Sequence, residues 1–363
     1  MIKILVEGMT EGKGGKETYI INIFRAFDKS KFLFSFISYN EKIAYQDELE
    51  AAGAEIIEIQ DRSKGLFAYR KALSEMFRNN HFDVLWANKT TLSSCEVLEI
   101  AKSYEIPLRI IHSHSSSNMG GELTYVLHNI NKLFVRKWAN EYFACSEMAA
   151  WWFFGNKSCT LIKNGINVAK FRFDSKIRES VRHELGMDDN LVLGHVGRFG
   201  IEKNHKKLLN VFYEVHKVNS KTKLVLCGDG EERAHIESQI HELGLEDSVV
   251  LMGVISNVNE VLQAMDLIVM PSLFEGLPFA LIEAQAAGLK CIVSDTVSQE
   301  SDILGWNSFL PLSDDDKVWA NKIIATDVTT DKRYSAAEVI KGKGYDICDC
   351  VRQIENIIGK HIY

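Results

Sequence analysis

The stretch LIVMPSLFEGLPFALIEA, Leu267–Ala284, contains the unit from which this chain is built. Its first four residues are apolar, which is typical of a short buried strand. Gly276 and Pro278 then mark a loop, and proline is favoured where a helix begins. The apolar residues that follow have helical spacing, so we expect a helix at Pro278–Ala287. A strand, a short loop and a helix in this order indicate a parallel sheet with helical crossovers.

The same unit recurs along the chain and restarts after Asn164. Strands are expected at Ile2–Glu7, Phe32–Ser38, Glu55–Ile59, Asp83–Ala87 and Leu108–His112, then at Leu191–Val196, Lys223–Cys227, Val249–Met252, Leu267–Met270 and Cys291–Ser294. Helices are expected between them, for example at Phe67–Asn79, Lys206–Val218 and Glu231–Leu243. The sequence therefore predicts an α/β fold with two doubly wound, Rossmann-like domains, residues 1–168 and 169–344. A helical segment, 345–363, is expected to pack back on the first domain.

Composition supports two globular domains and excludes several classes of protein. The chain has 363 residues, of which 46% are hydrophobic and 25% charged, and this length suits two domains. No apolar run is long enough for a membrane-spanning helix, and the N-terminus lacks the features of a secretory signal. Seven scattered cysteines suit a reducing cytosol, so a cytoplasmic location is expected. The net charge of −7 argues against a nucleic-acid partner.

A glycine-rich loop follows the first expected strand. Ligands of parallel sheets bind beyond the carboxyl ends of the strands, so this loop is a candidate site. Gly14 and Gly15 permit close approach of the backbone to a phosphate at the start of a helix. The loop lacks the G-x-G-x-x-G of dinucleotide folds and the G-K-[ST] of phosphate-binding loops. A simple tight turn is the alternative interpretation.

Two cations stand five residues apart in GRFGIEKNH, residues 197–205. Arg198 and Lys203 follow an expected strand, and both side chains can point to one site at the edge of the sheet. Guanidinium and ammonium groups together suit a diphosphate whose charge grows as it leaves. Two solvated surface cations are the alternative.

Two carboxylates flank the start of the helix expected at Pro278–Ala287. Glu275 lies in the loop, whereas Glu283 lies about one and a half turns into the helix, between apolar residues. A carboxylate in apolar surroundings needs a hydrogen-bond donor, and the vicinal diol of a ribose supplies two. Backbone groups at the start of this helix can also bind an anion. The expected donor-binding backbone comprises Gly276, Leu277, Pro278 and Phe279.

A run of polar residues, HSHSSS at 112–117, begins at the end of the strand expected at Leu108–His112. Contact with a sugar or an acceptor is expected for His112, Ser113 and His114. No third ligand with suitable spacing accompanies the two histidines, so no metal site is predicted. A purely structural role is the alternative.

These motifs together resemble the family 4 glycosyltransferases. G-R-F-x-x-E-K-N-H, L-x-L-x-G-D-G-E at Leu224–Glu231 and the E-x7-E pair carry the resemblance. The stretches RIIHSHSS, FACSEMAAWWFFG and LIKNGI also fit the EpsF-like group, which builds bacterial exopolysaccharide and capsule. The resemblance spans roughly residues 1–312. Residues 313–341 are unmatched, and Val254–Ser256 lacks an arginine that relatives often carry near this position.

The resemblance implies a GT-B fold, in which two domains face a central cleft, and a retaining hexosyltransferase that needs no metal or cofactor. A nucleotide-sugar, expected to be a UDP-sugar, would bind the second domain, and the acceptor would be a saccharide carried on lipid. By the resemblance, Arg198 and Lys203 would bind the diphosphate, Glu283 the ribose and Glu275 the transferred sugar. Gly14 and Gly15 would border the diphosphate and the acceptor, and Gly228 and Gly230 would approach the base. Either His114 or His112 would stand near the sugar, and the sequence does not separate them.

A basic amphipathic segment suggests peripheral contact with the inner face of the cell membrane. Lys132, Arg136 and Lys137 alternate with apolar residues, and the aromatic run Trp151–Phe154 follows. Core packing of these helices is the alternative.

Two other functions fit the same fold, a nucleotide-sugar 2-epimerase and a non-catalytic partner subunit. The complete set of Arg198, Lys203 and the E-x7-E pair disfavours both.

Overall fold

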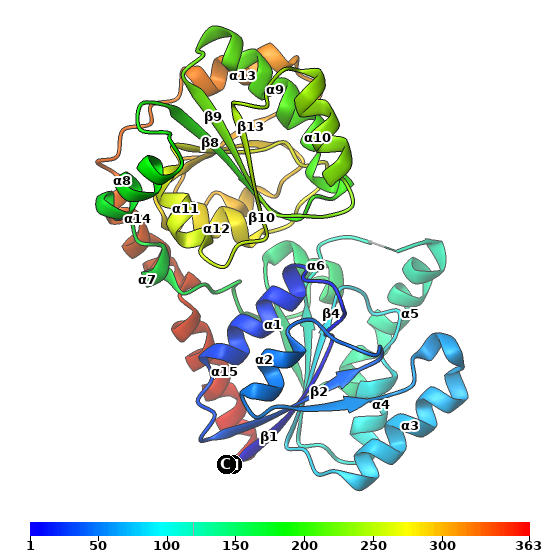
Figure 1. The fold of residues 1–363 in the computed structure, drawn as a ribbon. Helices are drawn as coiled ribbons and strands as arrows, with labels where there is room; N and C mark the ends of the chain where they lie inside the picture. The colour runs from blue at the N-terminus through cyan, green and yellow to red at the C-terminus, as the bar shows by residue number, and fades with distance from the viewer. Residues whose placement is uncertain (119) are drawn as a thin grey trace. The chain divides into compact units, whose positions relative to one another are not determined.

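The computed structural model describes residues 1–118 and 120–363, which form two compact units (Figure 1). The first unit contains residues 1–165 and 347–363, and the second contains residues 166–346. The chain therefore passes between the units at 165–166 and again at 346–347. Both crossings differ by two or three residues from the boundaries expected at 168 and 344. The difference arises because Ile166 bridges Asp346 and donates its N–H to the Tyr345 carbonyl at 2.9 Å.

The first unit is a parallel sheet with strand order β3-β2-β1-β4-β5-β6-β7. Its strands are β1 (Ile2–Glu7), β2 (Phe32–Ser38), β3 (Glu55–Glu58), β4 (Val84–Lys89), β5 (Leu108–Ser113), β6 (Glu141–Ala144) and β7 (Thr160–Leu161). Its helices are α1 (Gly15–Ala26), α2 (Gln46–Ala51), α3 (Leu66–Asn79), α4 (Glu96–Ser103), α5 (Glu122–Trp138), α6 (Glu147–Phe154) and α15 (Ile347–Ile362), with a short helical turn at Arg62–Lys64.

The second unit is a parallel sheet with strand order β10-β9-β8-β11-β12-β13. Its strands are β8 (Leu191–Val196), β9 (Thr222–Cys227), β10 (Val249–Gly253), β11 (Leu267–Met270), β12 (Lys290–Ser294) and β13 (Ser308–Leu310). Its helices are α7 (Val168–Phe171), α8 (Ser175–Glu184), α9 (His205–Val218), α10 (Arg233–Glu242), α11 (Val258–Ala264), α12 (Phe279–Ala286), α13 (Asp316–Ile324) and α14 (Arg333–Ile340). Shorter helical turns lie at Ile201–Lys203, Gln299–Ser301 and Lys341–Tyr345.

The strand order reverses once in each sheet, between β1 and β4 and between β8 and β11. In doubly wound sheets, ligands bind at the carboxyl ends of the strands next to such a reversal. The loops that leave β1, β4, β8 and β11 therefore mark the functional edge of each unit. The expected α/β class with two Rossmann-like sheets is confirmed.

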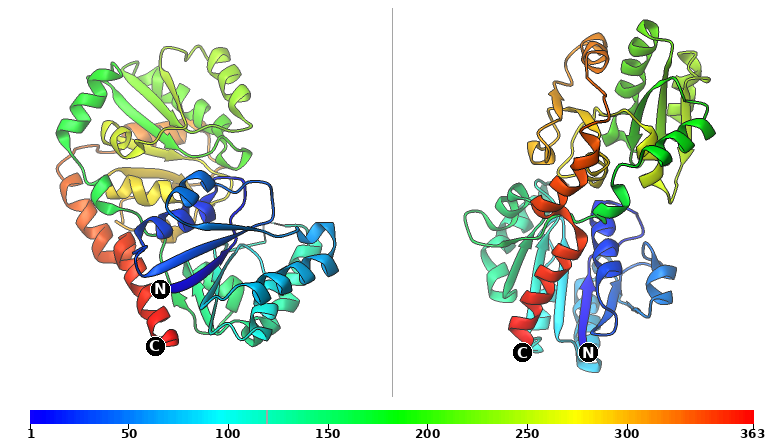
Figure 2. Two further views of the ribbon diagram at one scale, coloured as in Figure 1. Left: turned by 60° about the horizontal axis from the view of Figure 1, so that its bottom comes forward. Right: turned by 90° about the vertical axis from the view of Figure 1, so that its left-hand side faces the viewer.

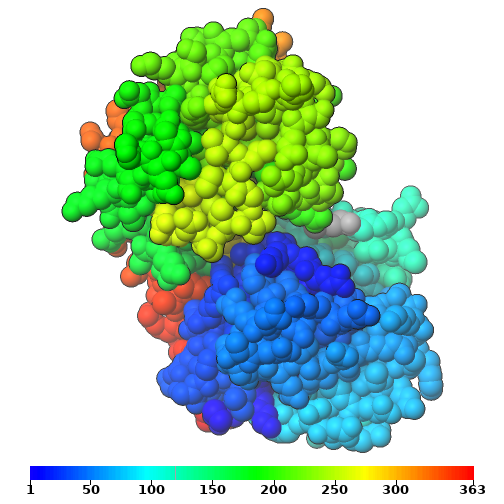
Figure 3. Space-filling model, in the orientation of Figure 1, coloured from blue at the N-terminus to red at the C-terminus, as the bar shows by residue number. Residues whose placement is uncertain are grey.

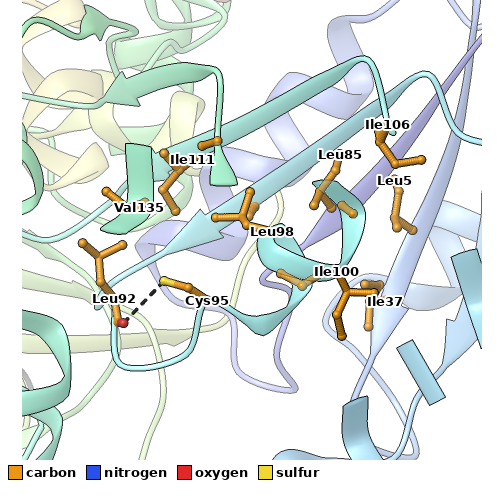
Figure 4. Packing of buried hydrophobic residues seen from close by; sticks show 14 of the residues in the cluster. Leu5, Ile37, Leu85, Leu92, Cys95, Leu98, Ile100, Ile106, Ile111 and Val135 are labelled. Carbon is orange, nitrogen blue, oxygen red and sulfur yellow. Dashed lines mark hydrogen bonds between the residues drawn. The ribbon is translucent and has the colours of Figure 1, made fainter. Parts of the chain in front are cut away.

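Apolar side chains cover both faces of the first sheet. On one face, Leu5, Leu85 and Ile111 of the strands pack against Leu98 of α4 and Val135 of α5 (Figure 4). On the other face, α1 and the C-terminal helix α15 lie side by side, as the two views in Figure 2 show. Because both faces of a parallel sheet are buried, polar side chains of its strands reach a ligand only near the carboxyl ends.

Candidate active site

Two glycines fix the loops that leave β8 and β9 in the second unit. Gly228 has φ +150°, and a Cβ atom there would lie 1.8 Å from the Gly197 carbonyl oxygen. A Cβ atom at Gly230 would lie 2.5 Å from the Phe199 carbonyl oxygen. The protein's own backbone therefore requires glycine at both positions. Their expected contact with a nucleotide base stays a prediction.

Lys203 and Glu275 form a shielded ion pair at the carboxyl edge of the second sheet. Nζ of Lys203 contacts Oε1 of Glu275, and the side chains are only 12% and 16% exposed. The loops that carry them are tied together, because the Leu273 N–H donates to the Glu202 carbonyl at 2.8 Å and Asn204 donates to the Pro271 carbonyl at 3.0 Å. Loops from β8 and β11 thus bring together two residues 72 positions apart in the sequence.

Arg198 pairs with Glu231 in this structure. Its guanidinium lies 2.8 Å from Oε2 of Glu231, and the side chain is 64% exposed. The sequence predicts that Arg198 and Lys203 point to one site, whereas this structure pairs each of them with its own carboxylate. An exposed ion pair of this kind contributes little free energy, so the guanidinium is free to turn toward a more highly charged ligand.

Glu283 lies on α12 between Leu281, Ile282 and Ala284, whose side chains are fully buried. Its carboxyl group is half-buried and makes no hydrogen bond or ion pair with any described residue. Burial raises the pKa of Glu283 to about 7. The unmet need for a donor that the sequence predicts is therefore present in the structure.

The start of α12 lies between the two carboxylates of the E-x7-E pair. Gly276 and Leu277 connect Glu275 to Pro278, which is the N-cap residue of α12 and offers no side-chain cap. Phe279 is the first helical residue. The N–H groups of a first helical turn carry partial positive charge and attract anions. Glu275, the start of α12 and Glu283 thus follow one another along one loop and helix.

In the first unit, the glycine-rich loop leads into α1. Gly14 is the N-cap residue and Gly15 the first helical residue, with no side chain capping the helix. A Cβ atom at Gly14 would lie 2.9 Å from Oε2 of Glu17, whereas at Gly15 it would meet nothing within 4 Å. Glu17 is held by Thr10 at 2.8 Å and by Lys16 at 3.3 Å. The loop is therefore ordered by its own polar contacts, and Gly15 leaves the start of α1 uncovered.

The structure corrects the expectations for His112 and Ser113. His112 is fully buried, with its ring centroid 4.9 Å from that of Tyr19 and 5.6 Å from that of Phe143. Ser113 is also fully buried, and its hydroxyl donates to the Ala149 carbonyl at 3.0 Å. Neither side chain reaches the surface, because β5 lies inside a sheet that is covered on both faces.

His114 is the histidine that remains available for a ligand. Its N–H donates to the Lys89 carbonyl at 2.8 Å, so the pairing of β4 and β5 extends one residue beyond β5. Its Nε2 lies 2.9 Å from Oδ1 of Asn88. Burial therefore favours His114 over His112, and the contact of His114 with a ligand stays a prediction.

A buried ion pair beside this site was missed in the sequence. Lys89, at the end of β4, lies 2.6 Å from Oε1 of Glu7, at the end of β1, and Tyr39 donates to the same oxygen at 3.3 Å. Burial acts to lower the pKa of Lys89, but its contact with Glu7 raises it above the ordinary value. A charged residue at the end of an otherwise apolar strand is the signal that points to such a pair.

The basic amphipathic segment is partly core and partly surface. Trp152, Phe153 and Phe154 are buried, as is Val135, so most of the aromatic run packs inside the first unit. Trp151 is 64% exposed, and α5 presents further apolar residues to solvent. The expectation of an aromatic surface is thus wrong for Trp152–Phe154 and applies to Trp151 alone.

Residues 1–118 and 120–363 contain neither a cluster of metal ligands nor a membrane-spanning helix. No three histidine, cysteine, aspartate or glutamate side chains gather there as metal ligands would. No helix in this part of the chain has the length and apolar composition needed to cross a membrane.

Known proteins resemble this chain in sequence and in fold. The family model "Glycosyl transferases group 1" matches residues 177–326, which include Arg198, Lys203, Glu275 and Glu283. The "Putative glycosyltransferase EpsF" of Bacillus subtilis is 31% identical over 361 residues, covering 95% of this chain and 93% of EpsF. An Escherichia coli UDP-Gal:alpha-D-GlcNAc-diphosphoundecaprenol alpha-1,3-galactosyltransferase is 31% identical over 140 residues, covering 38% of this chain and 36% of that enzyme.

Among solved structures, Anabaena HepE in complex with UDP matches with a TM-score of 0.79 and 19% identity, over 99% of this chain and all of HepE. The lipopolysaccharide outer core galactosyltransferase WaaB matches with a TM-score of 0.70 and 19% identity, again over 99% of this chain and all of WaaB. These likenesses concern the fold. Together with the identity to EpsF along nearly the whole chain, they show that the protein is a GT-B glycosyltransferase and belongs to the group 1 glycosyltransferase family.

Proposed function

We propose that the protein is a retaining hexosyltransferase that moves a sugar from a UDP-sugar to a saccharide carried on lipid, in the assembly of bacterial exopolysaccharide or capsule. The observation that carries the proposal is the half-buried Glu283 carboxyl group, which has no partner among the described residues and lies on the helix that begins just after Glu275 of the shielded Lys203–Glu275 pair. A nucleoside diphosphate-sugar supplies a partner for each of these groups.

When the donor binds, the charged residues of the site exchange partners within the protein for groups of the donor. The ribose diol donates two hydrogen bonds to Glu283, and the diphosphate takes the place of Glu275 beside Lys203. Glu275 is then free to accept hydrogen bonds from the transferred sugar. Arg198 leaves the exposed contact with Glu231 for the diphosphate, because a dianion attracts a guanidinium more strongly than one carboxylate does. In this proposal Lys203, Arg198 and the start of α12, rather than a metal ion, neutralise the leaving group.

Transfer passes through an oxocarbenium-like transition state. The bond between the sugar and the diphosphate breaks, and the departing oxygen accepts the proton of the incoming hydroxyl on the same face of the sugar. The cations act where negative charge develops, which is where electrostatic stabilisation lowers a barrier most. His114 contacts a hydroxyl of the sugar, and Gly14 and Gly15 border the diphosphate and the acceptor.

The names of relatives support the substrate classes. The Escherichia coli relative is named for UDP-Gal and for an acceptor on diphosphoundecaprenol, and a Campylobacter jejuni relative, 26% identical over 153 residues, is named for a diphospho-undecaprenol acceptor. HepE was crystallised with UDP. The same two classes, a UDP-sugar and a saccharide on a polyprenyl diphosphate, are what we propose for this chain.

A turnover assay tests this function. The full chain is incubated with a panel of UDP-sugars, with and without an extract of undecaprenyl-linked saccharides. We expect release of UDP and a new α-linked glycolipid only when both are present. Conversion of a UDP-sugar into its 2-epimer without an acceptor would instead indicate the epimerase. Absence of turnover with every UDP-sugar and acceptor would contradict the proposal.

An acceptor on lipid requires the protein to work at a membrane, and α5 offers a surface for it. Leu123, Val126, Ile130 and Leu133 recur at intervals of three and four residues along one side of α5, and each is 48–72% exposed. In Figure 3, teal surface from this part of the chain lies at the right-hand margin. We define these four residues as the α5 stripe.

Basic residues accompany the α5 stripe. Lys132, Arg136 and Lys137 lie on the same helix, and Nζ of Lys132 lies 5.5 Å from the ring centroid of the exposed Trp151. Exposed apolar side chains flanked by cations suit the interface of an anionic bilayer. We therefore propose that α5 docks on the inner face of the cell membrane.

Vesicle binding is expected to depend on the α5 stripe. The double variant Ile130→Asp/Leu133→Asp should weaken cosedimentation with vesicles rich in phosphatidylglycerol about tenfold, because two apolar anchors are lost and two negative charges gained. The matched control is Leu66→Asp/Phe67→Asp, which changes two exposed apolar residues of α3. Equal binding by the two double variants, or wild-type binding that 0.5 M salt leaves unchanged, would contradict the proposal.

A further inference from the structure

Asn88 occupies the position where the strand order of the first sheet reverses. It stands near the carboxyl end of β4, beside β1, and its side chain is buried with 1% exposed. Gly8, with φ +124°, follows β1 so closely that a Cβ atom there would lie 2.3 Å from the Asn88 carbonyl oxygen. The backbone that follows the neighbouring strand β1 thus packs directly against Asn88. None of the sequence motifs includes this residue.

The orientation of the Asn88 amide follows from its neighbours. Nδ2 lies 3.4 Å from the Glu7 carbonyl oxygen and 3.3 Å from the Trp86 carbonyl oxygen. Both of these atoms only accept hydrogen bonds, so the NH₂ group must face them. The opposite orientation would place three oxygens together in a buried space. Oδ1 of Asn88 is therefore fixed toward Nε2 of His114, at 2.9 Å.

This arrangement determines where the proton of His114 resides. Burial lowers the pKa of His114 well below its ordinary value, and His112 and Lys16 lower it further, so the ring is neutral and carries one proton. The ring lies among aromatic groups, 4.7 Å from Tyr19 and 4.2 Å from His112 between centroids. Because Oδ1 of Asn88 accepts only, the proton belongs on Nε2. Nδ1 then carries a lone pair, and no described residue hydrogen-bonds to it.

We propose that Asn88 is a positioning residue that holds His114 in the Nε2–H tautomer, so that Nδ1 accepts a hydrogen bond from the transferred sugar. The inference rests on the proposed function, in which His114 contacts that sugar. It narrows the substrate class, because an accepting nitrogen favours a hydroxyl or an amide N–H at this position. A carboxylate there, as in a uronic acid, would face the Nδ1 lone pair and is disfavoured.

Nuclear magnetic resonance of the wild-type chain tests the tautomer directly. Long-range proton–nitrogen spectra of the histidine-labelled protein, with the His114 signals assigned by their loss in His114→Gln, report which nitrogen is protonated. We expect a protonated Nε2 and an unprotonated Nδ1 throughout about pH 6–8. A protonated Nδ1, or an equal mixture of the two tautomers, would overturn the inference. The spectrum needs no substrate, so it decides the inference even if no UDP-sugar turns over and the proposed function fails.

Two variants test whether the tautomer matters for the sugar. Asn88→Leu removes the acceptor, so both tautomers should appear, and kcat/KM for the UDP-sugar that the wild type uses should fall about tenfold. Asn88→Asp keeps an acceptor but adds a negative charge, which raises the pKa of His114. Its kcat/KM should fall as the pH decreases toward 6, because the imidazolium donates at Nδ1.

Binding of UDP distinguishes this positioning role from a merely structural one. If Asn88 acts through His114, the Kd for UDP, which has no sugar for His114 to contact, should be the same in the wild type and in both variants. Asn80→Leu, which removes a partly buried amide elsewhere in the first unit, should leave kcat/KM unchanged. Asn88 does not act through His114 if Asn88→Leu weakens UDP binding as much as it lowers kcat/KM. The same conclusion follows if the variant changes neither the affinity for UDP nor kcat/KM.

Discussion

Lys203→Ala is expected to lower kcat about 10³-fold, because it removes the shielded cation that stabilises the departing diphosphate. The Lys203 side chain is only 12% exposed, so water replaces its ammonium group poorly. The same change leaves the Glu275 carboxylate without its cation, so its negative charge repels the diphosphate of the donor. Steady-state kinetics with saturating UDP-sugar measure this effect on kcat separately from binding.

A double-mutant cycle identifies the pair as the cause. Lys203→Ala and Glu275→Gln should be strongly non-additive in kcat, since each change disables the same unit. Lys206→Ala is the control, because this exposed lysine lies three residues further along on α9. Retention of more than a tenth of wild-type kcat in Lys203→Ala would show that the pair does not stabilise the leaving group.

Binding of a UDP-sugar is expected to weaken about tenfold per pH unit below pH 7, because Glu283 must lose a proton to accept from the ribose diol. The burial of Glu283 raises its pKa to about 7 from the ordinary value near 4.5. A UDP-sugar is the suitable probe, because its esterified diphosphate does not titrate in this range, unlike the terminal phosphate of UDP. Isothermal titration calorimetry between about pH 5.5 and 8.5 measures the dependence.

Protonation of Glu283 weakens binding of the donor but stabilises the folded state of the free protein. The folded state holds the proton of Glu283 up to about pH 7, whereas the unfolded chain releases it near pH 4.5. The stabilisation from protonated Glu283 is therefore complete below about pH 4.5 and is lost as the pH rises to about 7.

Glu283→Gln tests the origin of the pH dependence. This variant should bind the UDP-sugar about 10²-fold more weakly at pH 8 than the wild type does, since two charge-assisted hydrogen bonds are lost. Its affinity should also no longer change with pH. The control Glu214→Gln alters a carboxylate of α9 that pairs with Lys217 and should keep the wild-type profile. A wild-type profile in Glu283→Gln would remove Glu283 from the ribose site.

The sequence was sufficient for the strands with long apolar runs. Ile2–Glu7, Phe32–Ser38, Leu191–Val196 and Leu267–Met270 have the bounds expected from their hydrophobic pattern alone. The short strands β6, β7 and β13 have two to four residues, too few for any periodicity. The helix α8 was also missed, because Ile177 and Val181 are its only aliphatic residues and give a very short apolar pattern.

The site was predictable in its residue types but not in its contacts. The spacing of Arg198 and Lys203 could not reveal that Glu231 and Glu275, 33 and 72 positions away, are their partners. Strand alternation places His112 and His114 on the same side of β5, yet His112 is fully buried and His114 is only partly buried. Neighbouring elements decide that difference, and hydrophobic patterns along one strand carry no information about them.

Thermal unfolding with a panel of nucleotides tests the central claim most directly, namely that Lys203 and Glu283 hold the nucleotide part of the donor. UDP and UDP-sugars should raise the wild-type Tm by an amount that grows with ligand excess, and by more than ADP, GDP or CDP. Glu283→Ala and Lys203→Ala should lose most of this shift while keeping a single cooperative transition without ligand. Equal shifts in the wild type and both variants would contradict the account.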